Sequence, residues 1–306
     1  MKRYLLIALL GAGFIGGCSK SDDNTKTDDG GKKEEYKIDK VSFDRTNVGV
    51  NQVVVCSINK PSWAGDVVTY KWEFTNSKGE TGYITTDKNS SVLSPYFTGN
   101  YKVKVYLSSK GIEANNTNEL NVIDCDFGVG IFGNDKKVII DAKEFAGMSP
   151  ETGLGSGFYW PFEAGKPSEY ISFKTGNSYE KYIFSNGKFT AGTTELINEP
   201  FRSSSNGVER NLAYYRLLDL VDRWNKSLST NVAPVIKWRA GVTEDQKKKY
   251  ETIGTTKNDG IGWALLNKDI TEITADWSNT KVEAKARISA QADNSKYEMR
   301  FAIRKK

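Results

Sequence analysis

The chain offers a narrow set of reactive side chains. Its 306 residues include no histidine, three cysteines and 38 aspartates and glutamates. Without imidazole, Ser-His-Asp and Cys-His catalysis and every histidine-containing zinc site are excluded. Paired carboxylates at roughly 5–10 Å, as in glycosidases, remain the main catalytic option. Glu163, Glu169 and Asp276 are candidates, but no motif nominates a pair. We therefore assign no catalytic residue; the sequence leaves open whether the protein is an enzyme and favours one that is not.

One glycine-rich segment has the residue types of a ligand-binding loop. Residues 153–163 run from Gly-Leu-Gly-Ser-Gly directly into three aromatic rings and a carboxylate. Exposed rings of this kind stack on sugar faces or anchor a protein partner. We therefore predict ligand contacts by Tyr159, Trp160 and Glu163. The alternative is a strand that buries Phe158, Trp160 and Phe162 in the core. Tyr159 and Glu163 would then point outward.

No metal or cofactor site is predicted. Residues 128–133 match the G-x-G-x-x-G pattern, which in a Rossmann unit binds a pyrophosphate at a helix N-terminus. The strands expected after it pair antiparallel, without crossovers, so the glycines are interpreted as a bend between a sheet and a helix. No D-x-D-x-D loop provides clustered oxygens for calcium.

The first 18 residues form an export signal. Lys2 and Arg3 precede an apolar run over residues 4–15, which is shorter than the roughly 20 residues of a membrane span. The following Phe14-Ile15-Gly16-Gly17-Cys18 resembles the bacterial lipobox. The resemblance implies removal of residues 1–17 and acylation of Cys18 with palmitate-type chains, which would anchor the protein in a membrane. The alternative is an ordinary secretory signal with a chance cysteine.

Residues 18–37 are predicted to be a flexible tether, because they have too few apolar side chains to offset the entropy of ordering. Its first part, Ser19-Lys20-Ser21-Asp22-Asp23-Asn24, resembles the export tag of Bacteroidota-type surface lipoproteins. This resemblance implies a lipid-anchored protein of the outer membrane that faces the cell exterior. A solvated spacer is the alternative.

The charge distribution argues against nucleic acid as a partner. The net charge is +5, Lys2 and Arg3 account for two of these charges, and the other basic residues are scattered. Nucleic acid binding needs a concentrated basic surface. Beyond Cys18 the only thiols are Cys56 and Cys125, and the sequence leaves open whether they pair.

Residues 38–124 show the short alternating strands of a β-sandwich. Tyr70-Lys71-Trp72-Glu73-Phe74, followed by a turn with Gly79, resembles a strand and turn of polycystic-kidney-disease (PKD) type immunoglobulin-like domains. The run from Tyr96 to Val105 resembles their G-x-Y-x-V-x-V strand. Thr75-Asn76-Ser77-Lys78 replaces the glycine-aspartate turn of the family. The resemblance implies a spacer or contact module without catalytic residues.

Residues 125–306 are predicted to form an α+β domain with an antiparallel sheet. Helices are expected over 134–146, over 206–228 with a stripe through Val208, Leu212, Tyr215, Leu218 and Val221, and after a capping box at 243–246. Asn186-Gly187 predicts a tight hairpin. Strands are expected over residues 170–174, 181–184, 188–191, 235–240, 260–266, 270–277, 281–289 and 297–303. The repeated order of a helix and then strands is compatible with an internal duplication.

The sequence thus predicts a multidomain lipoprotein, with an all-β immunoglobulin-like sandwich followed by the α+β domain. We expect a surface-tethered binding or interaction module for a glycan or protein ligand. A carboxylate-dependent glycan hydrolase is one alternative. An envelope-assembly or inhibitor protein is another, and it should carry a broad apolar patch over its sheet.

Overall fold

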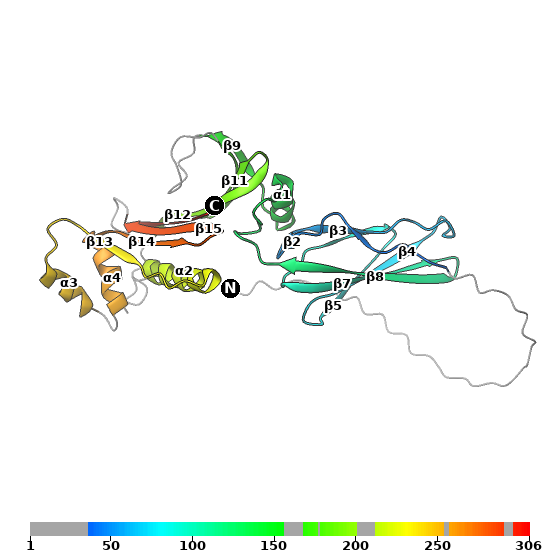
Figure 1. The fold of residues 1–306 in the computed structure, drawn as a ribbon, viewed down its shortest axis with the longest axis horizontal. Helices are drawn as coiled ribbons and strands as arrows, with labels where there is room; N and C mark the ends of the chain where they lie inside the picture. The colour runs from blue at the N-terminus through cyan, green and yellow to red at the C-terminus, as the bar shows by residue number, and fades with distance from the viewer. Residues whose placement is uncertain (1–35, 156–167, 177, 201–211, 254–256, 291–295) are drawn as a thin grey trace, which may run out of the picture. The chain divides into compact units, whose positions relative to one another are not determined.

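The computed structural model describes residues 36–155, 168–176, 178–200, 212–253, 257–290 and 296–306 (Figure 1). The buried apolar side chains form two clusters, one within residues 38–122 and one within residues 127–303. No helix among these residues is long and apolar enough to span a membrane. The predicted signal peptide, Cys18 and nearly all of the predicted tether lie outside the described residues.

The first cluster is the core of a two-sheet β-sandwich. Its strands are β1 (Ser42–Phe43), β2 (Val48–Gly49), β3 (Val54–Ser57), β4 (Thr69–Thr75), β5 (Thr81–Thr86), β6 (Ser90–Leu93), β7 (Gly99–Ser109) and β8 (Ile112–Ile123). One sheet has the order β1-β3-β6 and the other β2-β8-β7-β4-β5, and only the β2–β8 pair is parallel. This strand order is that of immunoglobulin-like sandwiches, so the predicted fold of this region is confirmed at that level.

The sandwich also has two side chains typical of that fold. Trp72 on β4 is completely buried. Tyr101, near the start of β7, accepts hydrogen bonds through its hydroxyl from the backbone N–H groups of Tyr96 and Phe97, both at 3.1 Å. This is the geometry of a tyrosine corner.

The disulfide of antibody domains is missing from this core. Two residues after Tyr101, where such domains place their second cysteine, stands Val103. Cys56 on β3 is a buried free thiol, and Cys125 is also free. The question of whether these two cysteines pair is thereby answered: they do not.

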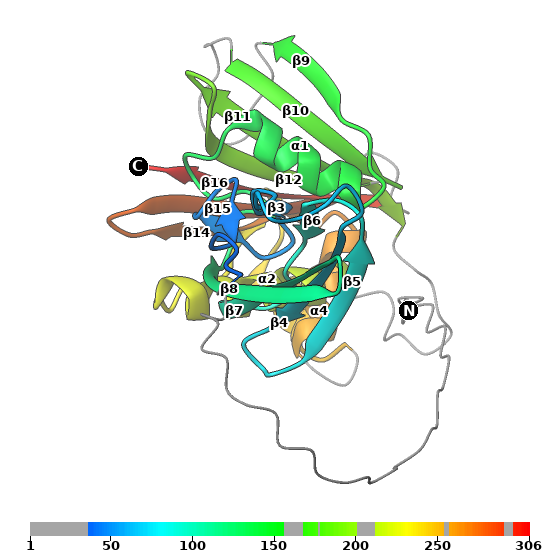
Figure 2. The ribbon, with the colours of Figure 1, turned by 90° about the vertical axis from the view of Figure 1, so that its right-hand side faces the viewer.

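The second cluster is formed by side chains of one eight-stranded antiparallel sheet and of the helices that pack on it. Figure 2 shows this sheet and its helices. The helices are α1 (Lys136–Phe145), α2 (Leu212–Leu228), α3 (Glu244–Glu251) and α4 (Lys257–Leu266). The strands are β9 (Glu151–Gly155), β10 (Ser168–Thr175), β11 (Ser178–Ser185), β12 (Lys188–Pro200), β13 (Val235–Trp238), β14 (Ile270–Ser278), β15 (Val282–Ala290) and β16 (Lys296–Lys305). They follow the order β13-β14-β15-β16-β12-β11-β10-β9, which is the predicted α+β architecture.

The sheet consists of two meanders that meet at their last strands. α1 precedes β9–β12 and α2 precedes β13–β16, with α3 and α4 inserted after β13. β12 pairs with β16 in the middle of the sheet. In Figure 2, α1 lies against the β9–β12 half, and Ile139 and Ala142 bury its apolar side. α2 packs against β14, β15 and β16.

Local signals located several elements. Thr243 and Gln246 form the predicted capping box at the start of α3. Asn186 and Gly187 both have positive φ, as a two-residue type I′ hairpin turn between β11 and β12 requires. Gly147, with φ of +79°, follows the end of α1, a position where glycine commonly ends a helix.

One predicted strand is wrong. Residues 260–266 belong to helix α4, not to a strand. The run Ile261-Gly262-Trp263-Ala264-Leu265-Leu266 is apolar on nearly all sides, and periodicity cannot separate a buried helix from a buried strand in such a run. Gly260 allows the helix to approach α3, because a Cβ there would lie 1.5 Å from the Tyr250 carbonyl oxygen.

The buried stripe of α2 agrees with the prediction only in part. Val221 is buried as predicted, but Tyr214 and Leu217 are buried in place of the predicted Tyr215 and Leu218, which are only partly buried. Apolar side chains occur on both neighbouring stripes of this helix. Packing against β14, β15 and β16 therefore decides which stripe faces the core.

Candidate ligand-binding cavity

The predicted ligand residues Tyr159, Trp160 and Glu163 lie outside the described residues, and their role stays a prediction. The other two carboxylate candidates do not form a pair. Glu169 is on β10 and forms an ion pair with Lys136, whereas Asp276 is exposed on β14. Four strands separate β10 from β14 in the sheet, so at about 4.8 Å per strand the two positions lie well beyond the separation of a catalytic carboxylate pair.

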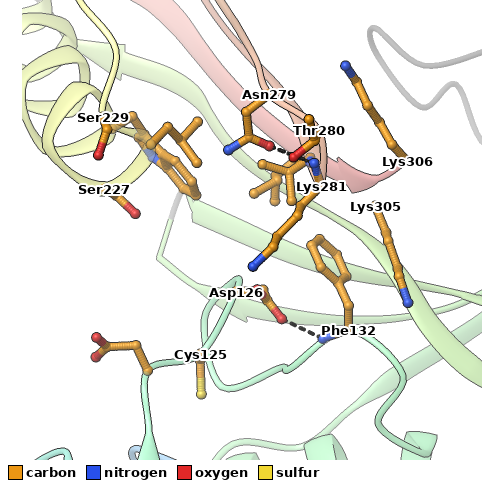
Figure 3. Close-up of a pocket in the computed structure, with 15 residues that line it drawn as sticks. Cys125, Asp126, Phe132, Ser227, Ser229, Asn279, Thr280, Lys281, Lys305 and Lys306 are labelled. Carbon is orange, nitrogen blue, oxygen red and sulfur yellow. Dashed lines mark hydrogen bonds between the residues drawn. The ribbon is translucent and has the colours of Figure 1, made fainter.

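The structure instead brings four distant segments together around a cavity of about 810 Å³, a volume in the usual range of small-ligand sites (Figure 3). The segments are the loop after β8, the C-terminal end of α2, the turn between β14 and β15, and the end of β16. The lining residues are Asp124, Cys125, Asp126, Phe132, Trp224, Ser227, Leu228, Ser229, Asn279, Thr280, Lys281, Val282, Ile303, Lys305 and Lys306.

The loop over residues 125–133 is positioned by close packing at two of its glycines. Gly128 has φ of +53°, and a Cβ there would lie 2.1 Å from the Tyr182 hydroxyl. A Cβ at Gly130 would lie 2.8 Å from the Phe189 ring. The Tyr182 hydroxyl accepts a hydrogen bond from the Val129 N–H at 3.2 Å and donates one to Glu180 at 2.9 Å. The G-x-G-x-x-G pattern thus serves packing.

A completely buried glutamine of the sandwich holds the same loop. Gln52 donates from Nε2 to the Val129 carbonyl at 2.7 Å and to Asn134 Oδ1 at 2.6 Å. Its Oε1 accepts the Gly49 N–H at 3.0 Å. Asn134 Oδ1 also accepts the Ile131 N–H at 2.9 Å. Because these groups are buried and paired, the loop backbone has little freedom to move.

Cys125 lines the cavity as a protonated thiol. Its Sγ donates to the Val50 carbonyl at 3.4 Å. Burial, with smaller contributions from the neighbouring Asp126 and Asp124, raises the pKa of the Cys125 thiol to about 12. The thiolate is the reactive form of cysteine, so this shift disfavours a nucleophilic role for Cys125.

Asp126 is the most perturbed acid of the cavity. Burial raises the pKa of its carboxyl group above the ordinary value. Three smaller effects oppose burial: the Phe132 N–H donates to Oδ2 at 2.7 Å, and the charges of Lys305 and Lys281 favour the ionised form. The hydrogen bond closes the loop and places the Phe132 ring at the cavity, as Figure 3 shows.

The C-terminal end of α2 provides the second ring. Trp224 is partly exposed and stacks on Phe301, with 4.9 Å between ring centroids. Asn225 closes the helix end by accepting hydrogen bonds at Oδ1 from Trp277 Nε1 at 3.0 Å and from the Val232 N–H at 2.9 Å. Ser229, with φ of +53°, ends the helix and leaves polar groups at the cavity.

The turn between β14 and β15 supplies an amide and an ammonium group. Asn279 Oδ1 accepts the N–H groups of Lys281 at 2.8 Å and Val282 at 2.9 Å, which fixes the turn. Figure 3 shows the Lys281 side chain extending toward Asp126. Within the described residues, neither Lys281 nor Lys305 has a carboxylate oxygen within 4.0 Å of its ammonium nitrogen.

This arrangement is suited to binding. Two partly exposed rings, Phe132 and Trp224, offer apolar faces, and serine, threonine, asparagine and lysine side chains offer hydrogen bonds beside them. Among the described residues, no group of three or more cysteine, aspartate or glutamate side chains lies close enough to hold a metal ion. Asp126 is the one cavity carboxyl whose pKa is clearly shifted.

Sequence reasoning missed this site because its residues carry no local signal. Asp126, Trp224 and Lys281 are separated by long stretches of chain and meet only in the folded protein. The Asp-Cys-Asp run after the last sandwich strand is the one feature that stands out in the sequence itself, as a polar segment at a predicted domain boundary.

No protein-family model matches the chain, and no curated protein is significantly similar to it in sequence. Two solved structures illustrate the structural matches. A segment of two fibronectin type III domains from chicken tenascin is 10% identical, covers 52% of this chain and 89% of its own, and has a TM-score of 0.24. A structure described as showing the basis of promiscuous specificity in carbohydrate-binding modules of the β-sandwich superfamily is 11% identical, with coverages of 88% and 90% and a TM-score of 0.27. At these TM-scores the matches do not define a shared arrangement of the whole chain.

Proposed function

We propose that this chain is a lipid-anchored binding protein that recognises a carbohydrate in the cavity of its α+β region. The observation that carries the proposal is the pair of partly exposed rings, Phe132 and Trp224, bordered by hydroxyl, amide and ammonium groups. A pyranose has an apolar C–H face, which stacks on an aromatic ring, and a rim of hydroxyl groups, which need polar side chains beside that ring. Tyrosine and tryptophan rings are well suited to such contacts because they bury much area at low entropic cost.

A second ring-rich surface, on the sandwich, is less suited to stacking on a sugar. Lys71 Nζ lies 4.5 Å from the centroid of Tyr83, and Lys104 Nζ lies 4.4 Å from that of Tyr106. These ammonium groups already cover a face of each ring through cation–π contacts, and neither tyrosine lines the cavity. We therefore propose a spacer or accessory role for the sandwich, as its resemblance to PKD-type domains implies.

We further propose that Cys18 is acylated and that residues 18–37 link the folded region to the outer membrane, facing the cell exterior. The lipobox-like residues and the acidic segment after Cys18 support this. A Cys18→Ala chain should remain unprocessed or leave the membrane fraction. Cleavage and membrane attachment of that variant would refute the anchor.

The proposed ligand class is tested by binding to a glycan array while turnover of the same glycans is followed. Trp224→Ala should abolish saturable binding and leave the circular dichroism spectrum unchanged. Tyr83→Ala on the sandwich is the matched control and should bind as the unaltered chain does. Saturable binding that survives Trp224→Ala would place the ligand elsewhere.

One observation favours a second candidate, the carboxylate-dependent glycan hydrolase: Asp126 has a raised pKa inside a cavity that Asp124 also lines. Against it, Asp126 already serves to close the 126–132 loop through Phe132. Turnover lost in Asp126→Asn would favour the hydrolase, whereas binding without turnover favours the carbohydrate-binding protein.

The alternative of an assembly or inhibitor protein predicted an apolar patch over the sheet. The described outer face of β14, β15 and β16 instead carries ion pairs such as Arg287–Glu272 and Arg304–Glu283.

A further inference from the structure

The cavity has an excess of ammonium groups on one wall. Lys281 begins the β15 side of the turn, and Lys305 lies on β16, where it pairs with Val282. The Lys306 N–H donates to the Lys281 carbonyl at 2.9 Å, so the backbone holds these positions together. Lys306 Nζ donates to Ser278 Oγ, whereas Lys281 and Lys305 have no ion-pair partner among the described residues.

The acidic wall does not neutralise these lysines. Asp126 is half-buried, and its Oδ2 is engaged by the Phe132 N–H. Lys281 and Lys305 act on it only at longer range, beyond ion-pair distance. A carboxylate that enters the cavity would therefore find two ammonium groups able to form charge-assisted hydrogen bonds without breaking an existing ion pair.

The sandwich shows that lysines beside rings need not behave in this way. Lys71 and Lys104 lie over tyrosine rings, and the Tyr106 hydroxyl donates to Glu73 at 3.1 Å. Those lysines are satisfied by the protein itself. In the cavity the rings of Phe132 and Trp224 instead stack on Phe189 and Phe301, and the lysines stand beside them.

From this geometry we infer that the ligand is an acidic carbohydrate, an oligosaccharide with uronic acid carboxylates that Lys281 and Lys305 bind while Phe132 and Trp224 contact the sugar faces. This inference rests on the proposed carbohydrate-binding function and specifies its ligand class. The hydroxyl groups of Ser227, Ser229 and Thr280 are placed to bind sugar hydroxyls. An acidic peptide would also use the lysines, and a poly-glutamate peptide therefore separates these two ligand classes.

The test compares matched ligands. The full chain, purified in a polyoxyethylene detergent without a sugar headgroup, is titrated calorimetrically with a panel of uronic-acid-containing oligosaccharides and with their carboxyl-reduced counterparts. We expect at least one acidic ligand to bind about tenfold or more tightly than its neutral counterpart, and added salt to narrow this difference. Lys281→Met with Lys305→Met should weaken binding of the acidic ligand about tenfold more than binding of its neutral counterpart, and so remove the difference.

The control variant carries Lys71→Met with Lys104→Met, the same chemical change at the lysines of the sandwich, and should keep the preference for acid. If acidic and neutral ligands bind equally, the inference fails while the carbohydrate-binding function stands. If no oligosaccharide of either kind binds, both fail. A poly-glutamate peptide that binds as tightly as the best acidic sugar would show recognition of charge alone and would overturn the carbohydrate assignment.

Discussion

The sandwich and the cavity of the α+β region contain the same kinds of side chains in opposite situations. In the sandwich, Trp72 is completely buried and the lysines lie over tyrosine rings. At the cavity, Trp224 is partly exposed, and Lys281 and Lys305 lack an ion-pair partner among the described residues. The difference teaches that aromatic and basic residues indicate a binding site only where the fold leaves them unsatisfied.

The largest expected difference concerns the two tryptophans. Trp72→Ala should lower the free energy of unfolding by about 3–5 kcal/mol, because it removes a large buried side chain and leaves a cavity. Trp224→Ala should cost less stability and abolish binding. Urea unfolding followed by circular dichroism measures the first effect. Trp72→Phe is a useful control: its cost should be clearly smaller, since the Trp72 indole nitrogen has no hydrogen-bond partner in the described part of the chain. Equal costs for both alanine variants would remove the contrast between the regions.

The link between the two regions is tested at Gln52. Gln52→Ala removes the hydrogen bonds that Gln52 makes to the Gly49 N–H and the Val129 carbonyl, and it leaves Asn134 with the Ile131 N–H alone. It should cost about 1–3 kcal/mol. It should also weaken ligand binding, because the 125–133 loop carries Phe132. Gln246→Ala is the matched exposed change and should cost less, since the Thr243 N–H that it bonds stays open to water. Unchanged affinity in Gln52→Ala would mean that the sandwich does not position the cavity.

A smaller effect is expected at the tyrosine corner. Tyr101→Phe removes the acceptor of two backbone N–H groups and should lower the free energy of unfolding by about 1–2 kcal/mol. Ligand affinity should not change, because Tyr101 does not line the cavity. Tyr83→Phe, on an exposed ring, should stay within about 0.5 kcal/mol of the unaltered chain. A loss of affinity in Tyr101→Phe would blur the division between a structural sandwich and a binding cavity.

The smallest effect is a pH dependence at the cavity. The pKa of Asp126 is raised in the folded state above its ordinary value of 3.8, so the neutral acid favours folding. The stabilisation of the folded state by the protonated Asp126 carboxyl group is fully present below the ordinary pKa. It is lost as the pH rises through the raised pKa of the folded state. Asp126→Asn keeps a neutral side chain at every pH. Its stability relative to the unaltered chain should therefore increase from acidic to neutral pH in parallel denaturation series. A constant difference would show that burial does not control this carboxyl group.

Sequence patterns were sufficient wherever a local rule governs the structure. Alternation located β4 and β7 because one face of each strand is buried. The Asn186-Gly187 pair located a hairpin because both residues tolerate positive φ. The Thr243 capping box located α3 because it satisfies backbone groups within one turn.

What the tertiary structure decided was every feature that depends on distant neighbours. Residues 260–266 became a helix because α3 packs against Gly260, and the stripe of α2 was selected by β14, β15 and β16. The cavity has the same origin. Asp126 ends up beside Lys281 through the antiparallel pairing of a sheet whose strands come from both halves of the domain. The sequence determined which side chains were available, but only long-range packing decided which of them stayed exposed and unpaired, because burial and ion pairing belong to the folded chain and not to any single segment.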